Sequence, residues 1–302
     1  MRILAVTIIL LMMACTKRLD VQTPSLAVSL DAARLVADTF VYKLGDTTKF
    51  MFSGNAANIA FYAGDAGHAY DNRNRNLALG TTILSFTSKA EYGTQTNTLQ
   101  LLATNKLNGL DSASVVNAAW TDITDKAALA SSATEVNSGT INLGGLVSNE
   151  NDSLFIAFKY SGITGTTQKT WTITNFLVSN VLPDLSYTLS SLSMDISYWT
   201  RYGNVWNPAN ARWTPTTTQL RIIGGGGASP SNTSWIVSKP LYVGRVAPDV
   251  SIALKSINNP DLTGYNYKYT AEGTYKATFV TFNNTVEKQE TVVQQFYIKV
   301  TP

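Results

Sequence analysis

The sequence predicts an all-β protein, and two observations lead to that prediction. Short segments in which apolar and polar residues alternate recur along most of the chain, separated by turns rich in Gly, Asn, Asp and Ser. Alternation with a period of two is typical of half-buried β-strands, and many short strands of this kind indicate a β-sandwich. Helical periodicity is nearly absent, and only "DKAALA", residues 125–130, is expected to form a turn or two of helix.

The expected strands share this alternation, which gives each of them one apolar face. In chain order they are "TTKFMFSG", "NTLQLLATN", "LFIAFKY", "LSMDISYW" and "VVQQFYIKV". In the fourth segment the residues expected on the apolar face are Leu192, Met194, Ile196 and Tyr198. Three tryptophans in strand-like surroundings are expected in a core, because buried aromatic rings dominate such cores: Trp120, Trp171 and Trp235.

The first residues carry an export signal. An apolar run from Ile3 to Ala14 is shorter than the about 20 residues that span a bilayer, so residues 1–14 are predicted to be a signal peptide. The run ends in "LMMAC", which resembles a bacterial lipobox, and Cys15 is therefore the predicted lipid-attachment site and membrane anchor. An ordinary signal peptide followed by a free thiol is the alternative. Residues 15–28 are polar, and we expect them to form a tether.

Composition argues against a nucleic-acid partner. Charged residues make up 14% of the chain, which is well below the roughly 25% of ordinary soluble domains. The longest cluster of basic residues is the pair Lys17 and Arg18. Because recognition of nucleic acid depends on clustered Lys and Arg, no nucleic acid is expected to bind.

The only histidine, His68, lies in "AGDAGHAYDN" and is the one candidate for a catalytic base. In that interpretation Asp65 or Asp71 would orient His68. The favoured alternative is a turn, since Gly, Asp and Asn are the residues that turns require. A glycoside hydrolase would need two carboxylates facing one sugar, and no segment places two acids on one face. We therefore predict no catalytic residue and a protein that is not an enzyme.

Metal and phosphate sites find little support. A zinc site would draw on several His or Cys residues, and this chain has one of each. The loop "NKLNGLDSAS" offers oxygen ligands for a structural calcium ion at Asn105, Asn108 and Asp111, with a plain solvated loop as the alternative. The segment "RIIGGGGASPS" lacks the Lys and Ser or Thr of a P-loop and is expected to be a flexible turn. No other cofactor is expected.

The segment "SYWTRYGNVWNPANARW", residues 197–213, is the strongest candidate for a binding site. Sugar rings stack their C–H faces on aromatic rings, while amide and guanidinium groups hydrogen-bond the hydroxyls. The predicted glycan-binding residues are Trp199, Arg201, Tyr202, Asn204, Trp206 and Asn207. Trp199 and Trp206 lie in the part richest in Gly, Asn and Pro, so these two are expected to be exposed. Packing of the same rings in a core is the alternative.

Several longer segments resemble known modules. "YKLGDTTKFMFSGNAANIAFYAGD" and "YNYKYTAEGTYKATFVTFNN" resemble the two halves of an immunoglobulin-like, PKD-type module. Between them, "AAWTDITDKAAL", "SGTINLGG", "LFIAFKYSG" and "KTWTITNFLVSN" resemble a galactose-binding-like jelly roll. Together with the lipobox, residues 20–302 resemble a family of Bacteroidota surface lipoproteins whose shared domain has no known function. Members are often encoded beside Sus-type importers.

This resemblance implies both an architecture and a function. Residues 29–77 and 248–302 would form one Ig/PKD-like sandwich, with a jelly-roll sandwich inserted at residues 78–247. The protein would be an outer-membrane, cell-surface lipoprotein that binds a glycan or other nutrient polymer beside a Sus-type importer. A structural or partner-binding subunit without its own ligand is the main alternative, and a glycoside hydrolase is the second. Lys17 and Arg18 depart from the acidic residues that follow the cysteine in such lipoproteins, so the leaflet face stays open.

Overall fold

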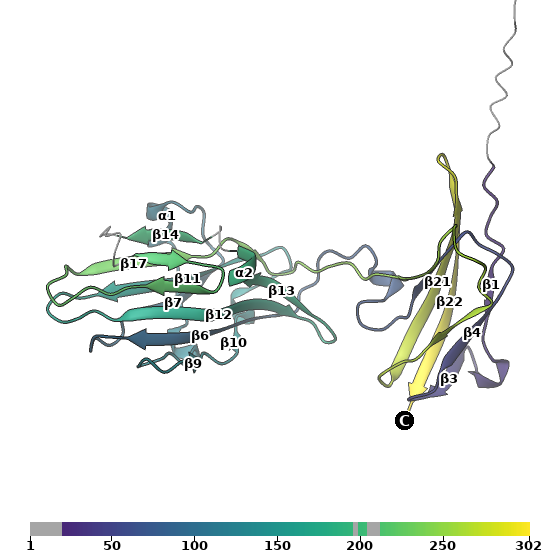
Figure 1. Ribbon diagram of the computed structural model, residues 1–302, viewed down its shortest axis with the longest axis horizontal. Helices are drawn as coiled ribbons and strands as arrows, with labels where there is room; N and C mark the ends of the chain where they lie inside the picture. The colour runs from purple at the N-terminus through teal and green to yellow at the C-terminus, as the bar shows by residue number, and fades with distance from the viewer. Residues whose placement is uncertain (1–19, 196–198, 204–211) are drawn as a thin grey trace, which may run out of the picture. The chain divides into compact units, whose positions relative to one another are not determined.

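The computed structural model describes residues 20–195, 199–203 and 212–302. Strands dominate these residues, which confirms the all-β prediction (Figure 1). The chain divides into two compact units. Unit 1 comprises the described residues up to Arg73 together with Asp249–Pro302, and unit 2 is Asn74–Pro248. The sequence analysis placed the corresponding boundaries after residues 77 and 247.

Unit 1 is a sandwich of two sheets. The smaller sheet has the order β1-β4-β20, with β1 at Ala27–Ser29, β4 at Thr48–Ser53 and β20 at Gly264–Tyr267. The larger sheet has the order β19-β5-β21-β22-β3-β2. In that order its strands are Ile252–Lys255, Asn58–Tyr62, Gly273–Asn284, Gln289–Thr301, Thr39–Lys43 and Leu35–Val36. Both sheets combine strands from the two ends of the chain, so neither end alone contains a complete sheet of this unit.

The core of unit 1 is built from phenylalanines on facing strands. Phe50 of β4, Phe61 of β5 and Phe279 of β21 are fully buried. The ring of Phe279 lies 4.9 Å from that of Phe50 and 4.7 Å from that of Phe61, between centroids. The alternation of β4 and β5 therefore has a direct structural meaning, because the apolar face of each strand contributes to one aromatic cluster.

The predicted tether is too long at its C-terminal end. Leu26 and Val28 are buried in the core of unit 1, and β1 pairs with β4. The side-chain amide of Gln294 holds the other edge of β1. It accepts a hydrogen bond from the Val28 N–H at 3.0 Å and donates one to the Leu26 carbonyl at 2.8 Å. The tether therefore ends before Leu26. The sequence analysis extended it to residue 28 because a short apolar edge strand is hard to distinguish from a linker by pattern alone.

Unit 2 is a second sandwich. One sheet has the order β10-β6-β12-β16-β15, with β13 paired to β12 and β9 to β6. These strands are Ile141–Asn142, Thr81–Glu91, Thr170–Val181, Gln219–Ile222, Trp213–Pro215, Ser186–Ser191 and Val136–Asn137, respectively. The facing sheet has the order β14-β17-β11-β7-β8, with β18 paired to β11. Its strands are Thr200–Gly203, Asn232–Val237, Ser153–Gly162, Leu99–Thr104, Thr121–Asp122 and Leu241–Tyr242.

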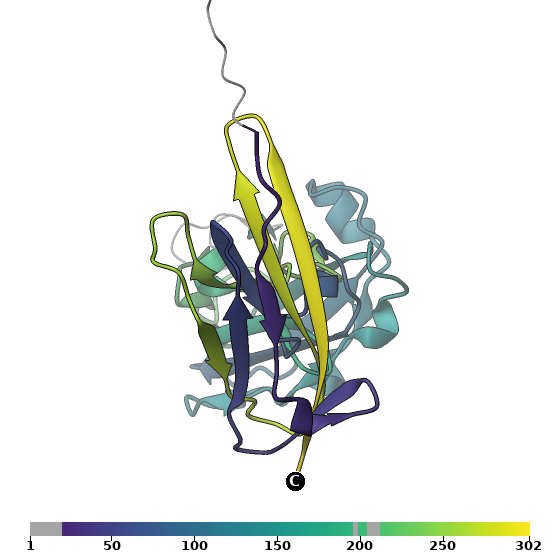
Figure 2. The ribbon, with the colours of Figure 1, turned by 90° about the vertical axis from the view of Figure 1, so that its right-hand side faces the viewer.

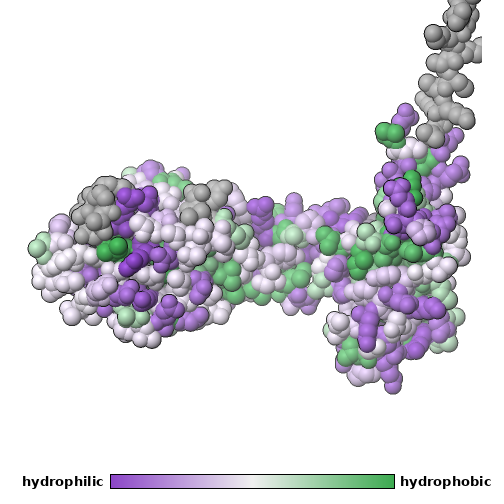
Figure 3. Space-filling model, viewed as in Figure 1, coloured by the Kyte–Doolittle hydropathy of each residue, from purple (hydrophilic) through white to green (hydrophobic). Residues whose placement is uncertain are grey.

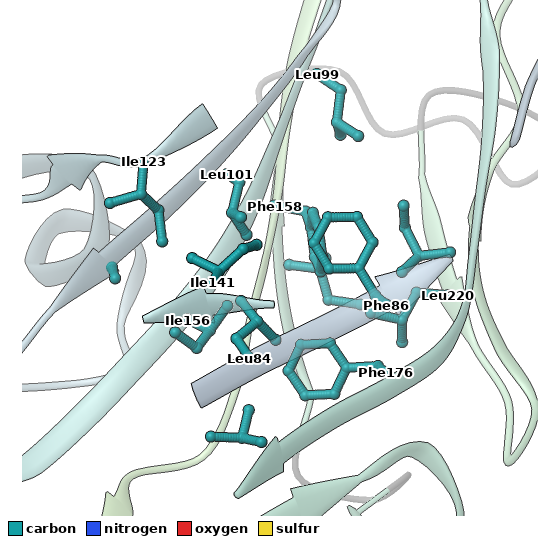
Figure 4. Close-up of a cluster of buried hydrophobic side chains, with 14 of the residues drawn as sticks. Leu84, Phe86, Leu99, Leu101, Ile123, Ile141, Ile156, Phe158, Phe176 and Leu220 are labelled. Atoms are coloured by element: carbon teal, nitrogen blue, oxygen red, sulfur yellow. The ribbon is translucent and has the colours of Figure 1, made fainter. Parts of the chain in front are cut away.

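The core of unit 2 lies between these sheets (Figure 4). The residues expected on one face of β11, Leu154 to Tyr160 at every second position, are all fully buried in it. The intervening residues Phe155 and Ala157 are buried as well. The short helix α1, Ser112–Asn117, covers the outer face of this sheet and contributes to a second apolar cluster there. Trp171 and Trp235 are buried as expected, and Trp120 is half-buried against Trp235.

One expected strand is wrong. The segment "LSMD" forms a single helical turn, α2 at Leu192–Asp195, with Leu192 buried and Met194 exposed. The chain leaves one sheet at the end of β13 and enters the other at β14, so it must turn a corner at this point. That requirement overrides the local alternation. Ile196 and Tyr198 lie outside the described residues.

Other helical segments are short. They are 3₁₀ turns at Ala32–Arg34, Tyr70–Asn72, Thr124–Lys126 and Gly144–Leu146. The third overlaps "DKAALA" by two residues, so that segment has less helix than expected. Within the described residues, no helix has both the length and the apolar character needed to cross a membrane.

Candidate functional site

The predicted aromatic platform does not form around Trp199. This side chain is only 7% exposed and packs edge-on against Phe176 of β12, with 5.1 Å between the ring centroids. Trp213, at the end of the same segment, is 1% exposed. The expected exposure of Trp199 is therefore wrong. It immediately precedes β14 and lies on the side of that strand that faces the core of unit 2.

Arg201 and Tyr202 lie on opposite faces of β14. The Arg201 guanidinium donates to the Trp213 carbonyl at 3.2 Å, and burial together with the positive charge of Arg212 lowers the pKa of Arg201. Tyr202 packs on the outer cluster opposite Trp235, its partner in the strand register. The two side chains cannot hold one ligand together. Asn204, Trp206 and Asn207 lie outside the described residues.

The predicted calcium ligands are exposed, and the hydrogen bonds of the described residues do not join these three side chains to one another. Asp111 caps helix α1, where its carboxylate accepts hydrogen bonds from the Ser114 hydroxyl and the Ser114 N–H. These bonds lower the pKa of Asp111. Asn105 and Asn108 lie on the exposed loop before it. Among the described residues no three His, Cys, Asp or Glu side chains gather in a group fit for a metal ion, and the calcium site stays a prediction.

His68 belongs to a tight turn. Its Nδ1 lies 3.2 Å from the Asp65 carboxylate, and backbone hydrogen bonds close the loop from Gly64 to His68. The other oxygen of Asp65 accepts a hydrogen bond from the Tyr267 hydroxyl. Burial of Tyr267, together with its hydrogen bond to the negatively charged Asp65, raises the pKa of Tyr267. Asp65 thus ties the turn to β20. This arrangement agrees with the turn interpretation, and the prediction of no catalytic residue stays a prediction.

A different residue, Tyr92, has the properties expected of a binding platform. It follows the last residue of β6, and its side chain is 68% exposed. Its backbone has φ of 56°, in the left-handed region that aromatic residues rarely adopt. Strained conformations of this kind gather at functional sites, where the surrounding structure imposes them.

The sequence pattern conceals this residue. Alternate residues of β6, from Thr82 to Ala90, point into unit 2, and the same period would place Tyr92 in the core. The left-handed backbone at Tyr92 ends the alternation and turns the ring outward. The only signal in the sequence is the Gly that follows the tyrosine. Gly93 also has positive φ, and a side chain there would overlap the Thr167 carbonyl.

Tyr92 borders an open depression of about 620 Å³ in unit 2. Its lining comes from three segments, residues 90–94, residues 131–133 and the pair Thr167 and Lys169. The volume is within the range of small-molecule sites, although this depression is open rather than enclosed. An open depression suits a ligand that is longer than the site, because the ends of the ligand can extend beyond it.

The depression carries both charges and several hydroxyl groups. The Glu91 carboxylate is paired with Lys89 at 3.0 Å, and the Lys169 ammonium donates to the Ser131 carbonyl at 3.1 Å. Thr94, Ser132 and Thr167 add hydroxyls along the rim. An aromatic face beside hydrogen-bonding groups of both kinds is the combination that recognises a polyhydroxylated ring. On the face of unit 2 seen in Figure 3, polar and weakly polar residues predominate and hydrophobic ones are scattered.

The surrounding loops are held by hydrogen bonds from two glutamine side chains, Gln95 and Gln168. Gln95 joins the loop after Tyr92 to the β11–β12 loop, because its side-chain amide bonds both to the Ile163 backbone and to Thr166. Gln168, which is buried, accepts from the Gly225 N–H and from Asn232. The first two glycines of the segment "GGGG", Gly224 and Gly225, are therefore packed against their neighbours. These contacts make the depression largely preformed.

Comparison with known proteins yields a family but no function. A family described as "Domain of unknown function (DUF5017)" matches residues 14–198, which is more than half of the chain. The matched range ends before β14, although β14 to β18 complete the sheets of unit 2. No curated protein and no solved structure matches the chain. The chain belongs to the family described as "Domain of unknown function (DUF5017)".

Proposed function

We propose that this protein is a non-catalytic lipoprotein of the outer membrane, anchored through Cys15, which binds a glycan or other nutrient polymer through unit 2. In this proposal it serves a Sus-type importer of a Bacteroidota cell as an accessory binding protein. The anchor is supported by the lipobox that ends at Cys15. The family match begins at Ala14 and so includes Cys15 itself.

The observation that carries the binding proposal is the exposed ring of Tyr92 beside an open polar depression. The ring offers a flat apolar face, and the positions of Glu91, Lys169 and the rim hydroxyls allow hydrogen bonds around a sugar stacked on it. Aromatic rings with a polar surround are a common form of ligand site. The left-handed backbone holds the ring outward even without a ligand, so less conformational freedom is lost on binding.

A panel of soluble polysaccharides from plant, host and microbial sources tests this proposal. The chain from Asp20 onward is run through native gels that contain each polysaccharide in turn. We expect at least one polysaccharide to retard the unchanged protein. Tyr92→Gly is expected to abolish the retardation, because it removes the ring and suits the left-handed backbone.

Two further variants make the result specific. Tyr242→Ala removes another exposed tyrosine of unit 2, which lies on β18 outside the depression, and its retardation should match the unchanged protein. Trp206→Ala tests the segment first singled out from the sequence. Loss of retardation in Trp206→Ala but not in Tyr92→Gly would move the site to that segment. Retardation by none of the polysaccharides would favour a structural subunit without its own ligand.

A further inference from the structure

The hairpin formed by β21 and β22 extends beyond the rest of unit 1. The two strands pair without interruption from Gly273 to Asn284. The neighbouring strand β5 pairs with β21 only as far as Phe282, and β3 pairs with the opposite end of β22. The last residues of the hairpin therefore project without a neighbouring strand, as both views show (Figures 1 and 2).

The end of this hairpin is an ordered turn with an apolar residue at its tip. The Thr285 N–H donates to the Lys288 carbonyl at 2.8 Å, and the Thr285 hydroxyl accepts from the Lys288 N–H at 3.2 Å. Val286 lies within this turn and is 101% exposed. No other large hydrophobic side chain among the described residues is as exposed. Because the turn is closed by its own hydrogen bonds, the valine is presented to solvent in a fixed position.

The N-terminal segment runs along the same hairpin toward the tip (Figure 2). The Asn283 amide donates to the Gln22 carbonyl at 2.8 Å. Closer to the tip, a hydrogen bond from Lys288 to Glu290 raises the pKa of Lys288, and the negative charge of Asp20 adds to this effect. The Asn283 contact thus places Gln22, two residues after Asp20, beside the end of the hairpin.

The distance along the chain from Asp20 to the anchor is short. Cys15 precedes Asp20 by five residues, which reach at most about 17 Å when fully extended. The lipid attached to Cys15 must therefore enter the bilayer close to the end of the hairpin. In the sequence, Lys17 and Arg18 lie between Cys15 and Asp20, and their positive charges favour an anionic membrane surface.

From these observations we propose that the β21–β22 tip is a membrane-contact site, at which Val286 enters the headgroup layer of the bilayer that holds the Cys15 lipid. This inference rests on the anchoring part of the proposed function. One valine buries far too little apolar surface to bind a membrane from solution. The anchor keeps the tip at high local concentration beside the bilayer, so a weak contact becomes populated and orients unit 1.

The cysteine content of the chain makes a direct test possible. Once Cys15 is acylated, a cysteine introduced by Val286→Cys is the only thiol that an environment-sensitive fluorophore can label. The full-length lipidated protein is reconstituted into vesicles of phosphatidylethanolamine and phosphatidylglycerol. The label is then exposed to aqueous iodide and, separately, to nitroxide groups carried on the lipid chains.

The control label is placed at the opposite end of unit 1 by Leu44→Cys. Leu44 is 45% exposed, and its N–H bonds to Thr301 at the far end of β22, which is roughly 40 Å long. We expect the label at Val286→Cys to be blue-shifted, quenched by the lipid nitroxides, and at least about threefold less sensitive to iodide than the label at Leu44→Cys. The same labelled chain started at Asp20 should show no shift with these vesicles.

A third label separates the valine from the dye itself. A fluorophore at Glu287→Cys should be shielded from iodide while Val286 is present. The added substitution Val286→Asp should make the same label sensitive to iodide. Equal iodide sensitivity at Val286→Cys and Leu44→Cys, in protein that stays bound to the vesicles, would overturn the tip contact and leave the anchor intact. If the fluorophore labels Cys15 itself and the protein does not bind to the vesicles, both the anchor and the tip contact would be overturned.

Discussion

Tyr92 combines a strained backbone with an exposed ring, and one substitution separates these two properties. A left-handed backbone costs a residue other than glycine about 1–2 kcal/mol, whereas glycine adopts it freely. Glycine also increases the entropy of the unfolded chain, which offsets part of that gain. We expect Tyr92→Gly to leave the free energy of unfolding unchanged or to raise it by up to about 1 kcal/mol. Denaturant unfolding measures this, and a loss of stability would show that the ring is structural.

The buried hydroxyl of Tyr160 should make the stability of the folded protein fall at alkaline pH. Burial raises its pKa to about 12, from about 10 in an unfolded chain, and its hydroxyl donates to the Lys169 carbonyl at 2.8 Å. The folded state therefore holds this proton more tightly than the unfolded state. The contribution to stability is complete below pH 10 and is lost as the pH rises towards 12.

Tyr160→Phe tests this assignment. The variant should lose about 1 kcal/mol at neutral pH, because the hydrogen bond to Lys169 is removed. Between pH 10 and 12 its free energy of unfolding should fall less steeply than that of the unchanged protein, by the equivalent of one proton. Thermal unfolding followed by circular dichroism across this range provides the measurement. Parallel curves for the two proteins would mean that another group governs the alkaline limb.

At the level of strands and loops, the segment "GGGG" should be sensitive at one glycine and tolerant at another. A side chain at Gly224 would overlap the backbone carbonyls of Gln168 and Lys169, whereas Gly226 has open space around it. Gly224→Ala is expected to destabilise the protein by about 1–3 kcal/mol and Gly226→Ala by much less. Chemical denaturation of both variants measures the difference. Equal effects would contradict the close packing of this loop.

Most strands were predictable because each buries one face and so alternates. The residues of β4, β7, β11 and β22 that the sequence assigns to one face are buried or partly buried in the cores. The failures lie where the chain leaves a sheet. At α2 the chain turns a corner between the sheets, and β1 is only three residues long, with Val28 as its one buried residue.

The candidate site was harder to predict for the same physical reason. Trp199 lies in a segment with the composition of a loop, but it adjoins β14 and fills the core beside Phe176. Tyr92 continues the buried face of β6, yet a left-handed backbone turns it outward. In both cases the direction of one side chain depends on backbone geometry, which composition and alternation do not encode.

For the whole molecule, the two units should differ in their ability to fold alone. All strands of unit 2 come from residues 74–248, and so does its core. This segment alone is expected to unfold cooperatively when heated. Residues 20–73 alone should remain unfolded, because β5 then lacks both of its neighbours, β19 and β21. Circular dichroism of the two fragments tests this, and a cooperative transition in the shorter one would contradict the interleaved sandwich.

The binding of a polymer by unit 2 is the central claim, and calorimetry tests it most directly. The polysaccharide that most retards the protein in gels is titrated into the unchanged protein, Tyr92→Gly and Tyr242→Ala. Removing a stacked ring from the depression should weaken binding at least about tenfold in Tyr92→Gly, while Tyr242→Ala keeps the original affinity. Equal affinities for all three, with Tyr92→Gly still fully folded, would contradict the account.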